Sequence, residues 1–163
     1  MSKSVKRVAR ATEALGLDIE IVRMGQSTRT AEDAAAACDC SVGQIVKSLI
    51  FKGRETGDLV LFLVSGANRV DPDKAETAVG QALDRVDAND VRARTGFAIG
   101  GVAPIGHLET PGIWIDTDLA KFDLIWAAAG APDAVFSTTP DDLARVTAAK
   151  WADLAGDRGG TAE

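Results

Sequence analysis

Residues 44–66 read QIVKSLIFKGRETGDLVLFLVSG and contain two apolar runs separated by the polar segment RETGD. Runs of this length, rich in Val, Ile, Leu and Phe and bounded by Gly and Asp, predict two β-strands joined by a turn. The second run, DLVLFLVSG, is nearly all apolar, so we expect a central strand covered on both faces. These two strands form the predicted centre of the fold.

Lys47 interrupts the first of these strands. In an extended chain the side chains alternate between two faces, so Lys47 shares a face with Ile45, Leu49 and Phe51. Such a lysine must be desolvated, reach past the apolar surface to water, or face a polar pocket. Two interpretations remain open: an edge-strand lysine whose stem covers the core, or a pocket cation that binds a phosphate, a carboxylate or a developing oxyanion.

The elements around this pair alternate irregularly between helix and strand. Thr30, Asp71, Asp87 and Thr139 are predicted helix N-caps, two of them followed by proline at the first helical position. Helices are predicted over residues 4–16, 30–38, 70–80, 87–94 and 139–146, and further strands over 17–24, 113–116, 123–130 and 133–137. The fold class is therefore α/β, a single compact domain over residues 1–155 with a mixed sheet flanked by helices. Residues 156–163 are predicted to be a disordered tail.

Composition limits the function before any motif is considered. The 163 residues are 46% hydrophobic and 26% charged, as expected for one globular domain. A net charge of −6 excludes nucleic-acid binding through bulk positive charge, so a polyanion would need a local basic patch. Cys38 and Cys40 are interpreted as unpaired, small hydrophobic residues in a reducing compartment rather than as a zinc site. Without a signal peptide or a long apolar run, the protein is predicted to be cytoplasmic, with no membrane contact.

Basic residues recur near the N-terminus. The predicted helix over residues 4–16 carries an apolar stripe of Val5, Val8, Thr12 and Leu15. Basic residues in and just before this helix recur at three- and four-residue spacing and are predicted to share one face: Lys3, Lys6, Arg7 and Arg10. Arg92 and Arg94 precede the glycine-rich segment described next. These cations form either a solvated surface or a local RNA contact.

Residues 95–107, TGFAIGGVAPIGH, contain four glycines and one proline and are predicted to be a loop, called the glycine-rich loop below. The paired Gly100 and Gly101 allow close approach of the backbone to a ligand, and their N–H groups suit an anion or a carbonyl oxygen. The loop is not a nucleotide-binding fingerprint. His107, the only histidine, either packs in the loop or acts as an acid or base.

Two further residues have an open assignment. Asp116 ends the strand IWID and either caps the following segment or faces a pocket. Gly130 is either a turn glycine or, if the end of its strand faces the glycine-rich loop, a pocket-lining residue.

Taken in order, VGQIVKSLIF, LVLFLVSG, VDPDKA, RTGFAIGGVAPIGH, IWID and WAAAG resemble the YbaK/ProX family. Its members are free-standing relatives of the editing domain inserted in bacterial prolyl-tRNA synthetase. The resemblance spans roughly residues 25–152. The most specific parts are the K-[ST]-L strand lysine and the G-G-[VI]-x-P-[ILFV]-G loop. The resemblance implies a compact α/β domain around a strongly curved mixed sheet with a pocket on one side.

The resemblance also implies roles for individual residues. The family's strand lysine corresponds to Lys47, its substrate loop to Gly100, Gly101, Pro104 and Gly106, and its later pocket glycine to Gly130. His107 matches only a subset of the family. Lys47, Gly100, Gly101 and His107 are the expected catalytic residues. The expected substrate-binding residues are Ser48, Ser65, Pro104, Gly106, Asp116 and Gly130, and the expected RNA contacts are Lys3, Lys6, Arg7, Arg10, Arg92 and Arg94.

The expected activity is hydrolysis of the aminoacyl ester of a mischarged tRNA, above all tRNA-Pro carrying Ala, Cys, Ser or Thr. No Ser-His-Asp or Cys-His arrangement is evident, so a positioned water is the expected nucleophile, helped by the RNA's 2′-hydroxyl or by His107. Aminoacyl-tRNA is the expected partner and prolyl-tRNA synthetase a further candidate; no cofactor, metal or DNA partner is expected. The alternative is a non-catalytic module of the same fold that binds an RNA end or a synthetase.

Overall fold

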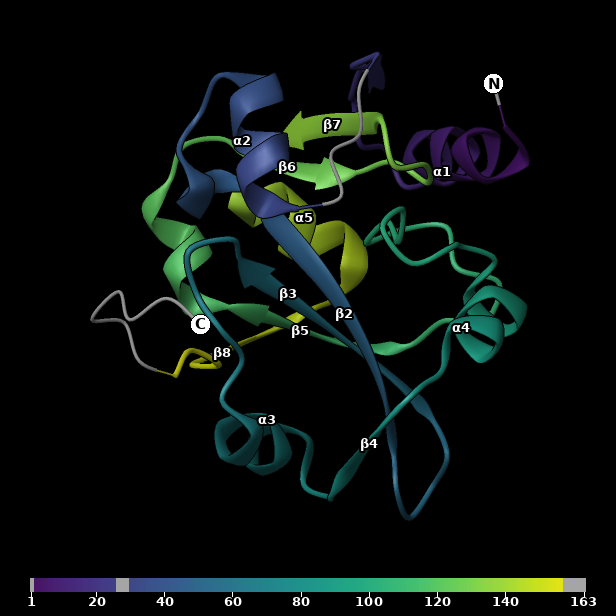
Figure 1. The fold of residues 1–163 in the computed structure, drawn as a ribbon, viewed down its shortest axis with the longest axis vertical. Coiled ribbons are helices and arrows are strands. Elements are labelled where there is room, and N and C mark those ends of the chain that lie inside the picture. The colour runs from purple at the N-terminus through teal and green to yellow at the C-terminus, as the bar shows by residue number, and fades with distance from the viewer. Residues whose placement is uncertain (1, 26–29, 157–163) are drawn as a thin grey trace.

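The computed structural model describes residues 2–25 and 30–156, and Figure 1 shows their arrangement. The helices are α1 (Lys3–Ala14), α2 (Ala31–Cys38), α3 (Pro72–Val79), α4 (Ala88–Thr95) and α5 (Pro140–Thr147). The strands are β1 (Val22–Arg23), β2 (Val46–Gly53), β3 (Leu59–Ser65), β4 (Leu83–Arg85), β5 (Gly112–Asp116), β6 (Ile125–Ala128), β7 (Ala134–Thr138) and β8 (Lys150–Ala152).

The two strands predicted from residues 44–66 are β2 and β3, and they lie at the centre of a five-stranded mixed sheet. Its order is β4-β2-β3-β5-β8. The hairpin pairs Lys47 with Val64, while β3 runs parallel to β5. Every residue of β3 is buried, so the prediction of a covered central strand is confirmed. Leu61 and Leu63 pack into the main core, and the other face of β3 packs against α3.

A second, three-stranded sheet has the order β1-β7-β6 and is antiparallel throughout. A parallel bridge between Ile45 and Trp126 connects it to the residue before β2. Figure 1 shows β6 and β7 close to the start of β2, with α2 beside them. This arrangement confirms the mixed α/β fold class and divides the strands between two sheets.

The capping signals are confirmed. Thr30, Asp71, Asp87 and Thr139 each accept a hydrogen bond from a backbone N–H in the first turn of the helix that follows. Each bond satisfies one of the N–H groups that a helix start leaves without an intrahelical partner.

Two local predictions were wrong, and two short strands were missed. Leu15, expected on the buried stripe of α1, is 43% exposed because α1 ends at Ala14. The strand predicted over residues 17–24 is limited to β1, because only Val22 and Arg23 lie alongside β7. The strands β4 and β8 were not predicted, since each is three residues long and is formed by pairing with β2 or β5.

The end of the described chain is packed rather than separate. The Gly156 N–H donates to the carbonyl of Arg69, and Lys74 Nζ donates to the carbonyl of Ala155. The predicted tail is therefore ordered at Gly156, and the rest of it, residues 157–163, lies outside the described residues. None of the described helices is long and apolar enough to cross a membrane.

Candidate functional site

Two adjoining cavities meet at Lys47. The larger, about 730 Å³, is bounded by β2, residues 69–72, the end of β4 and the glycine-rich loop. The smaller, about 550 Å³, is bounded by β2, α2, β6 and the same loop. Both are lined by Lys47, Ser48, Leu49, Ile99, Gly100 and Val102. Lys47 and Gly100, which the sequence placed in one site, are therefore brought together by the fold.

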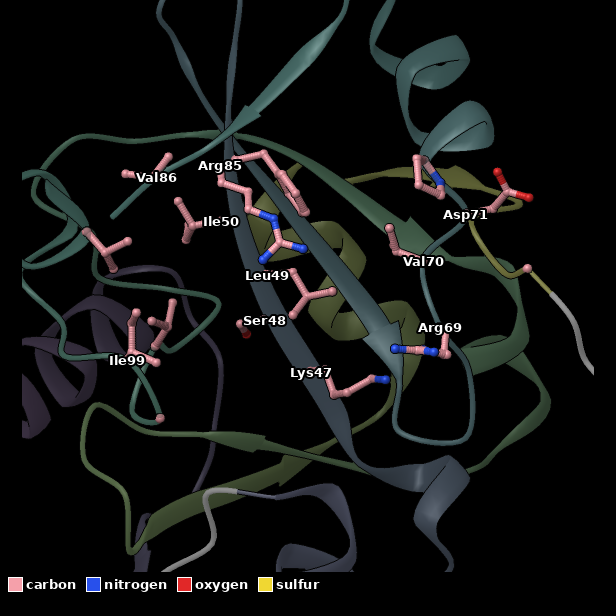
Figure 2. Close-up of a pocket in the computed structure, with 16 residues that line it drawn as sticks. Lys47, Ser48, Leu49, Ile50, Arg69, Val70, Asp71, Arg85, Val86 and Ile99 are labelled. Atoms are coloured by element: carbon pink, nitrogen blue, oxygen red, sulfur yellow. The ribbon is translucent and has the colours of Figure 1, made fainter. Parts of the chain in front are cut away.

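Lys47 is half-buried, and its stem lies beside Leu49 on the wall of the cavity (Figure 2). Its ammonium group donates a hydrogen bond to the carbonyl of Asn68. Burial lowers the pKa of Lys47; the neighbouring charge of Arg69 lowers it further, while Glu32 and Asp116 oppose the shift. Because Lys47 lines both cavities, the structure supports the interpretation of a pocket cation rather than a lysine that only covers the core.

Two arginines join Lys47 around the larger cavity, and sequence reasoning missed both. Arg69 lies on the segment after β3 and Arg85 at the end of β4. Figure 2 shows the ammonium group of Lys47 pointing toward Arg69 and the guanidinium of Arg85 directed toward Leu49. Among the residues that the structure describes, Asp71 is the only acidic one in the lining of this cavity, and its carboxylate already accepts two N–H groups at the start of α3. The larger cavity is therefore suited to an anionic ligand.

The smaller cavity is mainly apolar. Beyond the residues that it shares with the larger cavity, its lining includes Ala31, Ala34, Ile45, Trp126 and Val135. Its polar side chains are those of Thr30, Lys47 and Ser48. The Oγ of Ser48 is buried and has no hydrogen-bond partner within the described residues. A buried hydroxyl without a partner is unfavourable by about 1–3 kcal/mol, so Ser48 is a candidate for a hydrogen bond to a ligand.

Asp116 and Ser65 were predicted to bind substrate, and the structure places both beneath the cavities rather than in their lining. Asp116 is fully buried, and its carboxylate accepts hydrogen bonds from Ser65 N at 3.1 Å and Asn68 Nδ2 at 2.8 Å. Ser65 Oγ donates to the carbonyl of Gly43 at 2.7 Å. Asp116 therefore fixes the turn whose Asn68 carbonyl receives the Lys47 ammonium group. The Asp116 carboxylate is thus linked through Asn68 to the Lys47 ammonium group.

The glycine-rich loop contributes Gly100 to both cavities. The Gly101 N–H donates to the carbonyl of Ala98 at 3.0 Å, so only the Gly100 N–H stays a candidate donor to a ligand in this conformation. Gly101 packs tightly against Ala131, since a Cβ at Gly101 would lie 3.0 Å from the Ala131 Cα. Pro104 is buried and lies outside the lining of either cavity.

His107 does not line either cavity. Its Nε2 lies 2.6 Å from the Ala103 carbonyl, its ring packs edge-on against Phe97, and its buried Nδ1 has no partner within the described residues. Burial lowers the pKa of His107 to about 4, and the charge of Arg7 acts in the same direction. A histidine in this environment is neutral at physiological pH and packs the loop, which removes the geometric basis for an acid or base role.

The buried His107 should make stability depend on pH. Its pKa is about 4 in the folded state against an ordinary value of 6.5, so the unfolded chain binds the proton more readily. The contribution of His107 to the stability of the folded state is therefore complete above pH 6.5 and is lost as the pH falls toward 4. The loss should be about 3 kcal/mol in the free energy of unfolding. Urea unfolding of wild type and His107→Gln across this range should give a steeper decline for wild type; parallel curves would contradict the assignment.

Several predicted RNA contacts and loop glycines have internal partners instead. Arg7 is directed inward and bonds the carbonyls of Gly96 and Gly106, and Arg94 pairs with Glu109 at 2.6 Å. Gly106 and Gly130 pack against the backbone of α1 rather than lining a cavity. The predicted RNA contacts that stay exposed are Lys3, Lys6, Arg10 and Arg92.

The two cysteines are unpaired, as predicted. Both side chains are partly buried near the end of α2, and burial raises the pKa of Cys38 to about 11. Neither thiol lines the cavities around Lys47.

The fold is a small α/β domain in which Lys47 lies between two cavities, the larger one cationic and the smaller one mainly apolar. The chain belongs to the family of aminoacyl-tRNA editing domains, whose family model matches residues 26–146. It is 46% identical to a solved structure described as a candidate trans-editing enzyme for prolyl tRNA synthetase. That match has a TM-score of 0.90 and covers 96% of this chain and 99% of the other.

Two curated relatives extend the comparison. The chain is 30% identical over 139 residues to YwhH of Bacillus subtilis, an uncharacterized protein, covering 85% of this chain and 88% of YwhH. It is 28% identical over 127 residues to EbsC of Enterococcus faecalis, a candidate Cys-tRNA(Pro)/Cys-tRNA(Cys) deacylase, covering 72% of this chain and 77% of EbsC. A proline–tRNA ligase of Thermosipho africanus is 33% identical over 81 residues, which is 49% of this chain and 14% of the ligase.

Proposed function

We propose that this protein is a trans-editing hydrolase that cleaves the ester between a small, wrong amino acid and the 3′ end of tRNA-Pro. The observation that carries the proposal is the position of Lys47 and Gly100 at the junction of a cationic and an apolar cavity. An aminoacyl-RNA end has the same two-part character, a polyanion joined through an ester to an amino acid. The membership of the chain in the editing-domain family supports this match.

The larger cavity is proposed to receive the RNA end. Lys47, Arg69 and Arg85 supply positive charge there, which suits the terminal phosphate and ribose. The exposed cations Lys3, Lys6, Arg10 and Arg92 are proposed to contact the RNA outside the cavity. Because this is a small number of cations on a chain with net charge −6, binding should be weak and sensitive to salt.

The smaller cavity is proposed to receive the amino-acid side chain. Its apolar lining suits Ala, Cys, Ser or Thr, with the hydroxyl of Ser48 available to a polar group. Differences of one methylene between such side chains change binding by about 1–3 kcal/mol, so selectivity depends on the shape of this cavity.

In the proposed reaction a water molecule attacks the ester carbonyl carbon and gives a tetrahedral intermediate. The ammonium group of Lys47 and the N–H of Gly100 stabilise the negative charge on the carbonyl oxygen. The bond from the carbonyl carbon to the ribose oxygen then breaks, the ribose oxygen takes the proton that the attacking water has given up, and the free amino acid leaves. No protein side chain becomes acylated, and positioning of the water and the ester supplies most of the acceleration.

The proposed location is the cytoplasm, because aminoacyl-tRNA is made and used there. Prolyl-tRNA synthetase is a second proposed partner, because the chain is similar to part of a proline–tRNA ligase and to a candidate trans-editing enzyme for prolyl tRNA synthetase.

A deacylation time course tests the proposal. Purified protein is mixed with tRNA-Pro charged in turn with Ala, Ser, Cys, Thr and Pro, and free amino acid is measured over many turnovers. We expect catalytic release from one or two of the four wrong amino acids and none from prolyl-tRNA. Release from other mischarged tRNAs, and none from tRNA-Pro, would mean that tRNA-Pro is the wrong RNA in the proposal. Stoichiometric binding without release from any of them would favour a non-catalytic binding module.

A further inference from the structure

One side chain of α1 connects both ends of the glycine-rich loop. Arg7 Nε donates to the Gly106 carbonyl at 2.7 Å, and Arg7 Nη2 donates to the Gly96 carbonyl at 2.9 Å. The guanidinium lies 4.8 Å from the centre of the Phe97 ring, inside the loop. Ser4 Oγ, one turn earlier on α1, donates to the same Gly96 carbonyl at 3.1 Å. The loop is therefore held closed at its base by α1.

The backbone of α1 also packs directly on the segments beside the site. A Cβ at Gly106 would lie 3.3 Å from the Val8 Cα, and a Cβ at Gly130 would lie 2.9 Å from the carbonyl group of Ser4. Both glycines have positive φ, +87° and +102°, which side chains rarely adopt. The two glycines carried over from the family resemblance therefore serve contact with α1. Figure 1 shows α1 beside the loop that follows α4.

Arginine is the residue type that this contact requires. Its planar guanidinium can bond two carbonyl oxygens in fixed directions and stack on an aromatic ring, whereas a lysine ammonium is a single point charge. A Cβ at Gly96 would overlap the Arg7 guanidinium, so glycine at 96 allows the close approach. Arg7 is separated by 89 and 99 residues from its two partners, so the contact sets the tertiary position of the loop.

We propose that Arg7 is a positioning residue for the editing site. By holding the Gly96 and Gly106 carbonyls together, it fixes the loop that carries Gly100 relative to Lys47. The inference rests on the proposed function for its kinetic consequence. It gives α1 a role in the site, although the family match begins at residue 26, after this helix.

The kinetic test compares Arg7→Ala and Arg7→Lys with the matched control Arg145→Ala. Arg145 is an exposed arginine that pairs with Asp142 on α5 and lies outside both cavities. Single-turnover deacylation at saturating RNA should fall about 10- to 100-fold in Arg7→Ala, since small misplacements of reacting groups have effects of this size. The RNA concentration for half-maximal rate should stay within about threefold, because Arg7 does not line the larger cavity.

Arg7→Lys should retain an intermediate rate, and Arg145→Ala should match wild type. A wild-type rate in Arg7→Ala, or a loss confined to RNA binding, would overturn the proposal. Should Arg7→Ala fail to fold, Arg7→Lys and Ser4→Ala take its place, since each removes only part of the contact.

Hydrogen–deuterium exchange tests the same proposal without a substrate. In Arg7→Ala the amides of residues 98–102 should exchange at least about tenfold faster, while those of β3 keep their protection. Unchanged exchange in the loop would overturn the proposal. If wild type releases no amino acid from any tRNA, the proposed function and the kinetic role of Arg7 both fail. The exchange result then decides separately whether Arg7 holds the loop.

Discussion

Replacing Lys47 with alanine should lower kcat/KM for deacylation about 100- to 1,000-fold, the range found when a single oxyanion donor is removed from an enzyme. Within the described parts of the chain, Lys47 provides the only ammonium group in the lining that both cavities share. Its ammonium group is held by the Asn68 carbonyl and partly desolvated, which strengthens its interaction with a developing negative charge. The loss should appear mainly in kcat, because Arg69 and Arg85 still provide charge for the RNA end.

A second lysine on the same strand is the matched control. Lys52 lies near the C-terminal end of β2, opposite Asp84 of β4 in the strand register. It does not line either cavity. Lys52→Ala should keep wild-type turnover. Both variants should unfold within a few degrees of wild type, since neither removes a fully buried side chain. Turnover in Lys47→Ala within threefold of wild type would remove Lys47 from the mechanism.

Lys47→Arg is informative because it keeps the charge. A guanidinium is larger and planar, and it would have to displace the arrangement that the Asn68 carbonyl now fixes. We expect less than about one tenth of the wild-type kcat with nearly unchanged RNA affinity. Full activity in this variant would mean that charge alone, without its position, is sufficient.

Replacing Asp116 with alanine should reduce the free energy of unfolding by about 2–4 kcal/mol, because several buried donors lose their acceptor at once. The carboxylate accepts from Ser65 N, Asn68 Nδ2 and Asp118 N. For a chain of this size the melting temperature should fall by roughly 5–15 °C. Activity should fall as well at temperatures where the variant is folded, since Asn68 then no longer holds the Lys47 ammonium group.

Asp142→Ala controls for loss of a carboxylate. Asp142 lies in the first turn of α5, and its side chain pairs with Arg145 at 3.2 Å on the surface. Its removal should change stability by less than about 1 kcal/mol. Thermal and urea unfolding of both variants, with deacylation measured below each transition, separates the two effects. If Asp116→Ala were as stable as wild type, the buried hydrogen bonds of Asp116 would not stabilise the fold as predicted. If Asp116→Ala were also fully active, Asp116 would not be needed to position Lys47.

Local sequence patterns were sufficient for the centre of the fold and for the strand lysine. The apolar runs of residues 44–66 require burial, and their length and turn signals specify the hairpin of β2 and β3. Asp71 and Thr139 specify helix starts because a side-chain oxygen satisfies a nearby N–H without help from distant residues. The motifs around Lys47 and Gly100 were also sufficient to identify the family, which the editing-domain match confirms.

The contacts of Arg7, His107 and Asp116 are visible only in the tertiary structure. Helical spacing put Arg7 with Lys3 and Lys6, but spacing cannot show that the glycine-rich loop covers one side of that face. His107 was an available acid or base in the sequence, and it became a neutral packing residue when Phe97 and Ala103 enclosed it. Arg85 reached the cavity through β4, a strand too short to predict. The partners of Arg7 and Asp116 lie far away in the sequence, and Arg85 lies in an unpredicted element. The partners of His107 are close in sequence, but only the folded loop brings them around the ring. In each case the partner determines whether a polar group faces ligand, water or protein.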